Sequence, residues 1–275
     1  MSTRQFSTTS DLTVATTPIA ASDNRYTFDI PDGWQQGRGA YGGLVLAALA
    51  RAFVLFEPNK DRFLRSFNAE IAEPVMPGPA EVTVTELRRG NGLSSYTATL
   101  AQGGKNLVHS SAVLARARNA DPPQLHMAIP TRSPWRDIEP LPLNPNVPFV
   151  PTFLQHVEMR SIGPLPFSGA KVPVTEGWVR MRVPTPSLDA PEIIALADTW
   201  WPSLLTAASS PRPMATVAFT LQYFPATPPV DPVVPLYYRG RVVAEQEGYF
   251  AESRELWTED GRLLALNQQT IAQIK

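Results

Sequence analysis

The stretch DAPEIIALADTWWPSLLTAASSPRPMATVAFTLQYF, residues 189–224, predicts one helix, a proline-bounded corner and one strand. Asp189 with Glu192 three residues later is a helix-start signature. Pro202 cannot donate the hydrogen bond that would reach the carbonyl group of residue 198, so the helix should kink or stop just after Asp198. We therefore expect a short helix that ends close to an aspartate.

Asp198 shares a face of this helix with apolar side chains. Counted from Ile194, the positions three, four and seven further on are Ala197, Asp198 and Trp201. A surface or capping carboxylate is the ordinary interpretation of such a residue. A carboxylate removed from water has a raised pKa and is a candidate general base, and the rest of the chain favours this second interpretation.

Composition excludes several classes of function. The chain has 275 residues, 43% of them hydrophobic and 18% charged, which is ordinary for a globular protein of one large or two medium domains. A formal net charge of −1 gives no electrostatic footprint for nucleic acid or an anionic membrane, so neither is expected as a partner. The chain has no cysteine, which excludes disulfides, thiolate metal ligands and a cysteine nucleophile.

The N-terminal residues carry no continuous apolar core of the length that a signal peptide needs. No later segment reaches the roughly 18 apolar residues of a membrane span. We therefore expect a cytoplasmic protein with a flexible segment over residues 1–21.

The order of predicted elements occurs twice along the chain. In the first copy a strand at residues 25–30 and a glycine-rich segment precede an apolar, alanine-rich helix. After this helix, an antiparallel meander of four strands is predicted at residues 64–73, 80–89, 93–102 and 105–116. In the second copy strands are predicted on both sides of the helix that begins at Asp189, at residues 153–162, 175–183, 216–224, 235–244, 249–258 and 263–274.

The repeat extends to individual residues, because the segment from Ser66 to Pro74 resembles the segment from Thr216 to Pro225. We expect a first unit at residues 22–118 and a second at residues 151–275, joined by a proline-rich connection at residues 119–150. A sheet wrapped around one helix covers that helix on one side only. Two such units can pair and join their sheets, which also removes an exposed strand edge.

Several short motifs occur in order from about residue 25 to the end of the chain: Gly42-Gly43, Arg65-Ser-Phe67 with Pro74 and Pro77-Gly78, Leu87-Arg-Arg-Gly-Asn91, Leu196-Ala-Asp-Thr-Trp-Trp-Pro202, Ala215-Thr-Val217 and Asp260-Gly-Arg262. Their order and spacing resemble one family, the double-hotdog acyl-CoA thioesterases, similar to acyl-CoA thioesterase II. The resemblance implies an α+β double hotdog, in which each of two tandem copies wraps an antiparallel sheet around a long helix. It also implies an acyl-CoA substrate and no cofactor.

The resemblance further implies that an aspartate, a hydroxyl residue and a glutamine hold the attacking water. These roles fall on Asp198, Thr216 and Gln269, with Thr220 and Gln268 as neighbouring alternatives for the last two. The chemistry fits these side chains, because a thioester needs only a positioned water, a base and donors for the developing oxyanion.

Two further groups are candidates for binding the substrate. Backbone N–H groups near Gly42 and Gly43 at the start of the first helix are candidate oxyanion donors, and close packing of helix on sheet explains these glycines equally well. Trp201, next to Trp200, is a candidate pocket wall that limits the length of the acyl chain.

Strict alternation along residues 216–224 places Thr216 and Thr220 on the face opposite Phe219 and Leu221. If the apolar face packs on the helix, Thr216 points away from it. A twisted strand end, a bulge, or a site formed across the two copies would each resolve this conflict, and we favour a site across the copies.

Other constellations are weak. His109, His126 and His156 have no second ligand at metal spacing, so no metal site is predicted. The segment Gly92-Leu-Ser-Ser-Tyr96 lacks the last glycine of a nucleophile elbow. Arg88-Arg89-Gly90-Asn91 is better explained as a hairpin turn with solvated arginines than as a phosphate site.

Two alternative functions remain open, a hotdog hydratase or dehydratase and a non-catalytic acyl-thioester-binding protein. The first is disfavoured because neither predicted helix contains a histidine. We also expect a homodimer or higher homo-oligomer, because paired hotdog sheets leave outer edges to cover.

Overall fold

The structure is a computed structural model, and it describes residues 11–118, 130–144 and 150–274. Within these residues, twelve strands form one sheet in which every neighbouring pair is antiparallel. In sheet order the strands are β1 (Ala20–Ser22), β2 (Arg25–Ile30), β6 (Gly78–Arg89), β7 (Leu93–Gln102), β8 (Lys105–Ala115), β5 (Phe63–Ile71), β11 (Met214–Tyr223), β14 (Leu263–Gln273), β13 (Tyr249–Trp257), β12 (Leu236–Gln246), β10 (Val174–Met181) and β9 (Val157–Ser161).

The sheet consists of two halves with the same internal order. In the first half, β5 lies beside β8, and β7, β6 and β2 follow outward. In the second half, β11 lies beside β14, and β13, β12 and β10 follow outward. The prediction of a simple meander is therefore wrong for β5, which pairs with β8 rather than with β6, its successor in sequence.

The two halves join where β5 pairs with β11. Phe67 and Phe219 make an edge-to-face contact across this seam, with ring centroids 6.2 Å apart, and both side chains are fully buried. The sheet is thus continuous through the middle of the molecule, as the pairing argument predicts.

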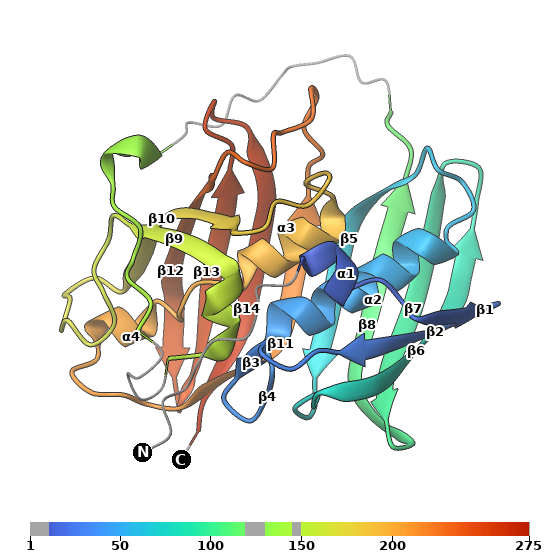
Figure 1. The fold of residues 1–275 in the computed structure, drawn as a ribbon, viewed down its shortest axis with the longest axis horizontal. Helices are drawn as coiled ribbons and strands as arrows, with labels where there is room; N and C mark the ends of the chain where they lie inside the picture. The colour runs from blue at the N-terminus through green and yellow to red at the C-terminus, as the bar shows by residue number, and fades with distance from the viewer. Residues whose placement is uncertain (1–10, 119–129, 145–149, 275) are drawn as a thin grey trace.

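Two helices lie side by side on one face of this sheet (Figure 1), α2 (Gly42–Phe56) and α3 (Ala190–Ala197). Asp189 caps α3, since its side chain accepts a hydrogen bond from the Glu192 N–H at 3.2 Å, and Asp198 is the C-cap, as the sequence predicts. Arg51 of α2 pairs with Asp189 at the start of α3, while Asp198 at the end of α3 meets Gly42 at the start of α2. The two helices therefore run antiparallel.

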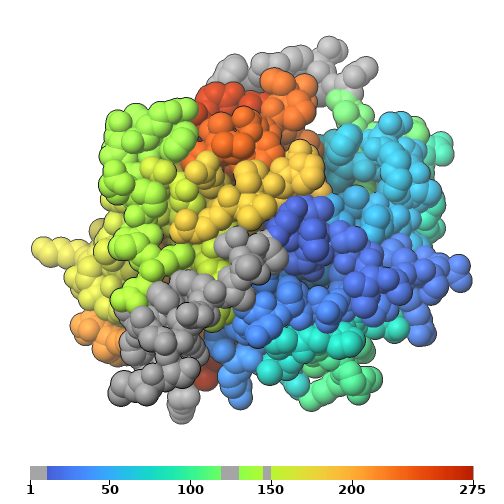
Figure 2. Space-filling model, viewed as in Figure 1, coloured from blue at the N-terminus to red at the C-terminus, as the bar shows by residue number. Residues whose placement is uncertain are grey.

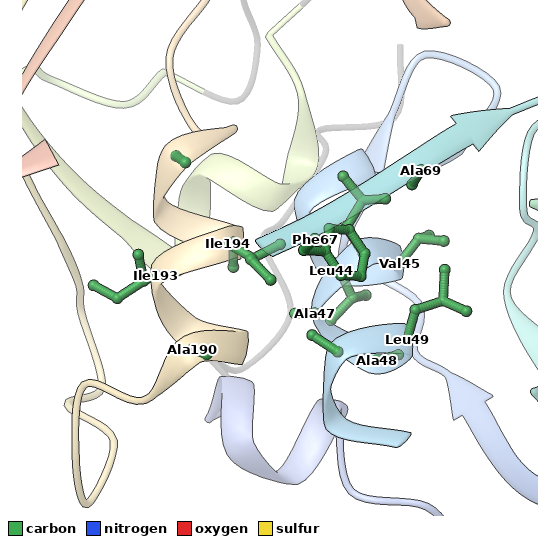
Figure 3. Close-up of a cluster of buried hydrophobic side chains, with 14 of the residues drawn as sticks. Leu44, Val45, Ala47, Ala48, Leu49, Phe67, Ala69, Ala190, Ile193 and Ile194 are labelled. Carbon is green, nitrogen blue, oxygen red and sulfur yellow. The ribbon is translucent and has the colours of Figure 1, made fainter. Parts of the chain in front are cut away.

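Apolar side chains fill the space between the helices and the sheet. Ile194 of α3 lies between the two helices and faces Leu44 and Ala47 of α2, with Phe67 of the sheet beside them (Figure 3). Almost every residue of α2 from Gly43 to Phe53 is buried, as expected of a helix that is hydrophobic all round.

Residues 11–21, which belong to the segment predicted to be flexible over residues 1–21, include a short helix and part of a short strand in the structure. Asp11 caps the short helix α1 (Leu12–Ala15), and the Leu12 side chain is only 2% exposed in the same core. Figure 2 shows this dark blue segment against the orange-yellow segment that contains α3. Apolar burial fixes α1 although the local sequence is rich in serine and threonine. Residues 1–10 lie outside the described residues.

The remaining elements are short. In the proline-rich connection, which lies partly outside the described residues, Trp135–Asp137 form the 3-10 helix η1. The strand predicted at residues 153–162 begins only at Val157, because Thr152–His156 form the 3-10 helix η2. The other elements are α4 (Leu204–Ala207) and a small ribbon of β3 (Gln35–Gln36) and β4 (Gly39–Ala40). Among the described helices, none has both the length and the apolar character to cross a membrane.

Candidate active site

Asp198 lies where the end of α3 meets the start of α2 and the inner face of the sheet. Its side chain is 9% exposed, so the carboxylate is almost removed from water but still reachable. The helix stops here, ahead of Pro202, as the sequence predicts. The carboxylate is therefore held at a helix end on the buried side of the molecule.

Gln269 of β14 bridges Asp198 and Thr216. Its Nε2 donates to Asp198 Oδ1 at 2.9 Å and to Asn267 Oδ1 at 3.1 Å, and its Oε1 accepts from the Thr216 hydroxyl at 2.7 Å. This orientation of the amide is the one that places N–H groups against both oxygen neighbours. The structure thus brings the three predicted side chains into one hydrogen-bonded chain.

A β-bulge explains how Thr216 reaches this chain. The register between β11 and β14 shifts between Thr216 and Ala218, so Val217 is an extra residue and the alternation changes phase there. Thr216 therefore lies on the same side as Phe219, against the expectation from strict alternation. Of the three resolutions weighed from the sequence, the bulge accounts for Thr216, and the site also lies between the two halves because Gly42 belongs to the first.

The alternatives on the neighbouring positions lie elsewhere. Gln268 is exposed, whereas Gln269 is only 2% exposed, because adjacent residues of a strand face opposite sides. Thr220 meets this network only through its backbone carbonyl, which accepts from Asn267 Nδ2 at 2.8 Å. The geometry therefore favours Thr216 and Gln269.

Burial raises the pKa of Asp198 above its ordinary value, because a carboxylate is poorly stabilised away from water. The Arg254 guanidinium is the largest opposing influence, followed by the Gln269 amide and the Gly43 backbone N–H, while the charge of Glu252 raises the pKa further. Asp198 is thus a more basic carboxylate than usual, and its neighbours limit how far it is raised.

Gly42 lies directly against Asp198. A methyl group in place of its hydrogen would stand 2.7 Å from Asp198 Oδ2. Since Oδ1 is the oxygen that Gln269 and Arg254 contact, Oδ2 is the oxygen that faces the start of α2. Close packing therefore requires a glycine here, and the same packing brings a helix N-terminus to the carboxylate.

A buried ion-pair network behind Asp198 was not predicted. Arg254 Nη1 lies 3.4 Å from Asp198 Oδ1, and Arg254 Nε lies 2.9 Å from Glu252 Oε1. The signal was present in the sequence, because Glu252 and Arg254 lie on the same inward face of β13 as Phe250 and Leu256. Two charged residues on the inward face of a strand indicate a functional or paired site.

Trp201 is partly buried, with its ring in edge contact with Trp200 at a centroid distance of 5.1 Å. Trp200 is only 2% exposed and stacks on Tyr238. The pair thus belongs to the wall of the core next to the end of α3, and a role of Trp201 in substrate binding stays a prediction.

The described histidines, His109 and His156, and the arginine turn lie apart from this site. His156 stacks on Trp34 with ring centroids 3.9 Å apart, and burial lowers its pKa to about 4. His109 is exposed on β8, and His126 lies outside the described residues. Arg89 pairs with Glu86 on the surface. Among the described residues, no group of three or more histidine, aspartate or glutamate side chains could hold a metal ion.

The first half carries a bulge at the matching place but not the same side chains. The register of β5 on β8 shifts between Leu64 and Ser66, so Leu64 corresponds to Thr216. Ala112 lies opposite Phe67, as Gln269 lies opposite Phe219. Leu64 and Ala112 are 1% and 2% exposed, so the first half has apolar residues at these positions.

Each half of the chain matches a model of a known protein family. Residues 30–117 match a model of the acyl-CoA thioesterase N-terminal domain, and residues 123–272 match a model of the acyl-CoA thioesterase C-terminal domain. The chain belongs to the acyl-CoA thioesterase family. The family assignment confirms the prediction of a thioester-hydrolysing enzyme.

Solved structures show the same fold. A hot dog protein of unknown function from Alicyclobacillus acidocaldarius is 22% identical, with a TM-score of 0.85 over 96% of this chain and 98% of that one. A putative thioesterase II from Thermobifida fusca is 21% identical, with a TM-score of 0.82 over 98% and 100%. An acyl-CoA thioesterase II from Mycobacterium marinum is 16% identical, with a TM-score of 0.75 over 96% and 98%. The prediction of a double hotdog is confirmed. A comparison with curated proteins found no significant match.

Proposed function

We propose that this thioesterase hydrolyses acyl-CoA to a free acid and CoA at a site formed by Asp198, Thr216 and Gln269. The observation that carries the proposal is the hydrogen-bonded chain from Thr216 through Gln269 to Asp198 Oδ1. This chain fixes the carboxylate and leaves Oδ2 turned toward the start of α2.

The hydrogen bonds assign different roles to the three side chains. Both N–H groups of Gln269 are already used, and its carbonyl oxygen accepts from Thr216, so Gln269 orients the other two rather than holding the water itself. The Thr216 oxygen still has acceptor capacity. A water that donates to Thr216 Oγ1 and to Asp198 Oδ2 has a lone pair free for the thioester carbon.

The reaction follows from this placement. Asp198 takes a proton as the water oxygen bonds to the carbonyl carbon, and the carbonyl oxygen becomes an oxyanion. The first turn of α2, at Gly42 and Gly43, acts on that oxyanion through the positive end of the helix dipole, while the Gly43 N–H itself bonds to Asp198. The C–S bond then breaks, and the departing thiolate receives the proton held by Asp198. Atoms and charges balance without a covalent enzyme intermediate.

The test is release of free thiol from a panel of acyl-CoA substrates by the wild type and by Asp198→Asn. Loss of a positioned general base lowers the rate by about 10²- to 10⁴-fold, so Asp198→Asn should fall by that range. Its circular dichroism and melting temperature should show a folded protein. Undiminished hydrolysis by the folded variant rules out Asp198 as the base. If the wild type binds acyl-CoA saturably without hydrolysing it, the protein is an acyl-thioester-binding protein and not an enzyme.

We also propose that the chain forms a homodimer or a higher homo-oligomer. The support is the end of the sheet at β1, a three-residue strand whose residues are all exposed and which has a partner on one side only. Sedimentation should give a mass that is a multiple of the 30.2 kDa chain, and a single 30.2 kDa species refutes the proposal.

A further inference from the structure

A buried arginine lies directly behind the proposed general base. The Arg254 side chain is 2% exposed and reaches in from β13. Its Nη1 donates to Asp198 Oδ1 at 3.4 Å and to the Ala197 carbonyl oxygen at 3.2 Å. One guanidinium group therefore contacts both the carboxylate and the last carbonyl group of α3.

The other side of the guanidinium is fixed by Glu252, whose side chain is fully buried. Arg254 Nε donates to Glu252 Oε1 at 2.9 Å. The same carboxylate accepts from the Ser203 backbone N–H at 2.8 Å and from the Ser203 hydroxyl at 3.1 Å. Ser203 precedes α4, so the network links β13 to both ends of the segment between α3 and α4.

Such a network is not explained by stability alone. Removing charges from water is costly, and well-packed apolar residues would stabilise the same space as well or better. A guanidinium group also keeps its charge in any environment that proteins provide, and it presents its donors in a fixed fork. This arrangement therefore holds a permanent positive charge at a fixed distance from Asp198.

We propose that Arg254 is a positioning residue that anchors Asp198 Oδ1, leaves Oδ2 for the substrate water, and keeps the carboxylate ionised at neutral pH. Glu252 holds the guanidinium in place and moderates its effect through an opposite charge. This inference rests on the proposed function, in which Asp198 is the general base.

The remaining groups that face Asp198 are neutral. Tyr41, which precedes α2 and donates to the Ala195 carbonyl oxygen, has a pKa that burial raises well above its ordinary value. Burial also raises the pKa of Tyr238 on β12. Gln269 on β14 carries no charge. Among the described residues, Arg254 and Glu252 are therefore the full charges that act on Asp198.

The experiment is the pH dependence of kcat/KM in Arg254→Gln and Glu252→Gln. The acid limb of this profile reports ionisation of the base in the free enzyme. A positive charge at this distance lowers the pKa of a carboxylate by about 1 to 3 pH units. Without that charge, Arg254→Gln should move the limb upward by the same amount. Glu252→Gln keeps the size of the side chain and one of its two acceptor oxygens but removes the opposing charge, so it should move the limb downward.

Arg160→Gln is the matched control. Arg160 also forms a partly buried ion pair, with Glu158 at 2.9 Å, but it lies on the edge strand β9, which β12 and β10 separate from β13. The control should leave the acid limb in place. If the acid limb lies at the same pH in the wild type and in Glu252→Gln, the proposal is overturned even if Arg254→Gln fails to fold.

A second readout does not need turnover. The side-chain 13Cγ resonance of Asp198, identified by its loss in Asp198→Asn, should titrate at a higher pH in Arg254→Gln and at a lower pH in Glu252→Gln. If no acyl-CoA is hydrolysed but these shifts occur, the proposed function fails and the positioning role stands. If hydrolysis occurs and neither the limb nor the resonance moves, the positioning role fails and the proposed function stands.

Discussion

Gly42→Ala should slow the enzyme strongly without unfolding it. The added methyl carbon would stand 2.7 Å from Asp198 Oδ2, where an ordinary contact begins at 3.4 Å. The carboxylate would have to retreat by about 0.7 Å, and Gln269 and Arg254 hold its other oxygen. The methyl group also stands on the side of Oδ2 where we place the water.

The expected magnitude follows from this displacement. A misplacement of about 1 Å in a reacting group costs about 10²-fold in rate, so we expect kcat to fall by about 10- to 100-fold, or about 1.4 to 2.7 kcal/mol of transition-state stabilisation. The fold should tolerate the change, because Gly42 has no positive φ and alanine favours a helix more than glycine does.

The assay is thiol release at saturating acyl-CoA, together with the melting temperature. Gly92→Ala is the matched control, since a methyl group there meets nothing within 4 Å and Gly92 also has no positive φ. It should keep the full kcat. A Gly42→Ala variant with wild-type kcat, or one whose structure shows Asp198 unmoved, refutes the reasoning.

Three further predictions concern charge, pH and packing. Gln269→Glu should lower kcat at neutral pH and move the acid limb of kcat/KM upward, because a second carboxylate beside Asp198 raises its pKa. Burial raises the pKa of Glu192 from 4.5 to about 9, so the stability it contributes is complete below pH 4.5 and is lost toward pH 9. In urea denaturation Glu192→Gln should therefore be more stable than the wild type at pH 8. Its free energy of unfolding should also depend less steeply on pH, because one such group contributes up to about 1.4 kcal/mol per pH unit; the same pH dependence in both proteins would contradict this. Phe219→Ala should lower the free energy of unfolding by about 3 to 5 kcal/mol, because Phe219 is fully buried against Phe67 at the seam, and a loss below 1 kcal/mol would contradict it.

Much of the architecture could be predicted because its signals are local. The Asp189 cap and Pro202 define the two ends of α3, and glycine-rich turns separate strands such as β7 and β8, so these elements lie within two residues of their predicted positions. The pairing of β5 with β8 was missed, because alternation shows which residues form a strand but not which strand lies beside it.

The candidate site could be predicted in its residues but not in its geometry. Asp198, Thr216 and Gln269 come from motifs, whereas the bulge at Val217 depends on how β11 and β14 pair and has no glycine or proline to mark it. The roles of Arg254 and Glu252 depend on what packs behind Asp198, and the groups that do so come from strands and helices far apart in the sequence. Similarly, α1 is fixed by contacts with the core and not by its own propensity.

The seam between β5 and β11 makes the two copies of the repeat mutually dependent. Gly42 comes from one copy, and the acid, hydroxyl and amide come from the other. A product of the first copy alone would expose a bare strand edge and carry no reactive group, and the second copy alone would lose the helix that faces its acid. Selection for hydrolysis can therefore retain the first copy even though Leu64 and Ala112 perform no chemistry of their own.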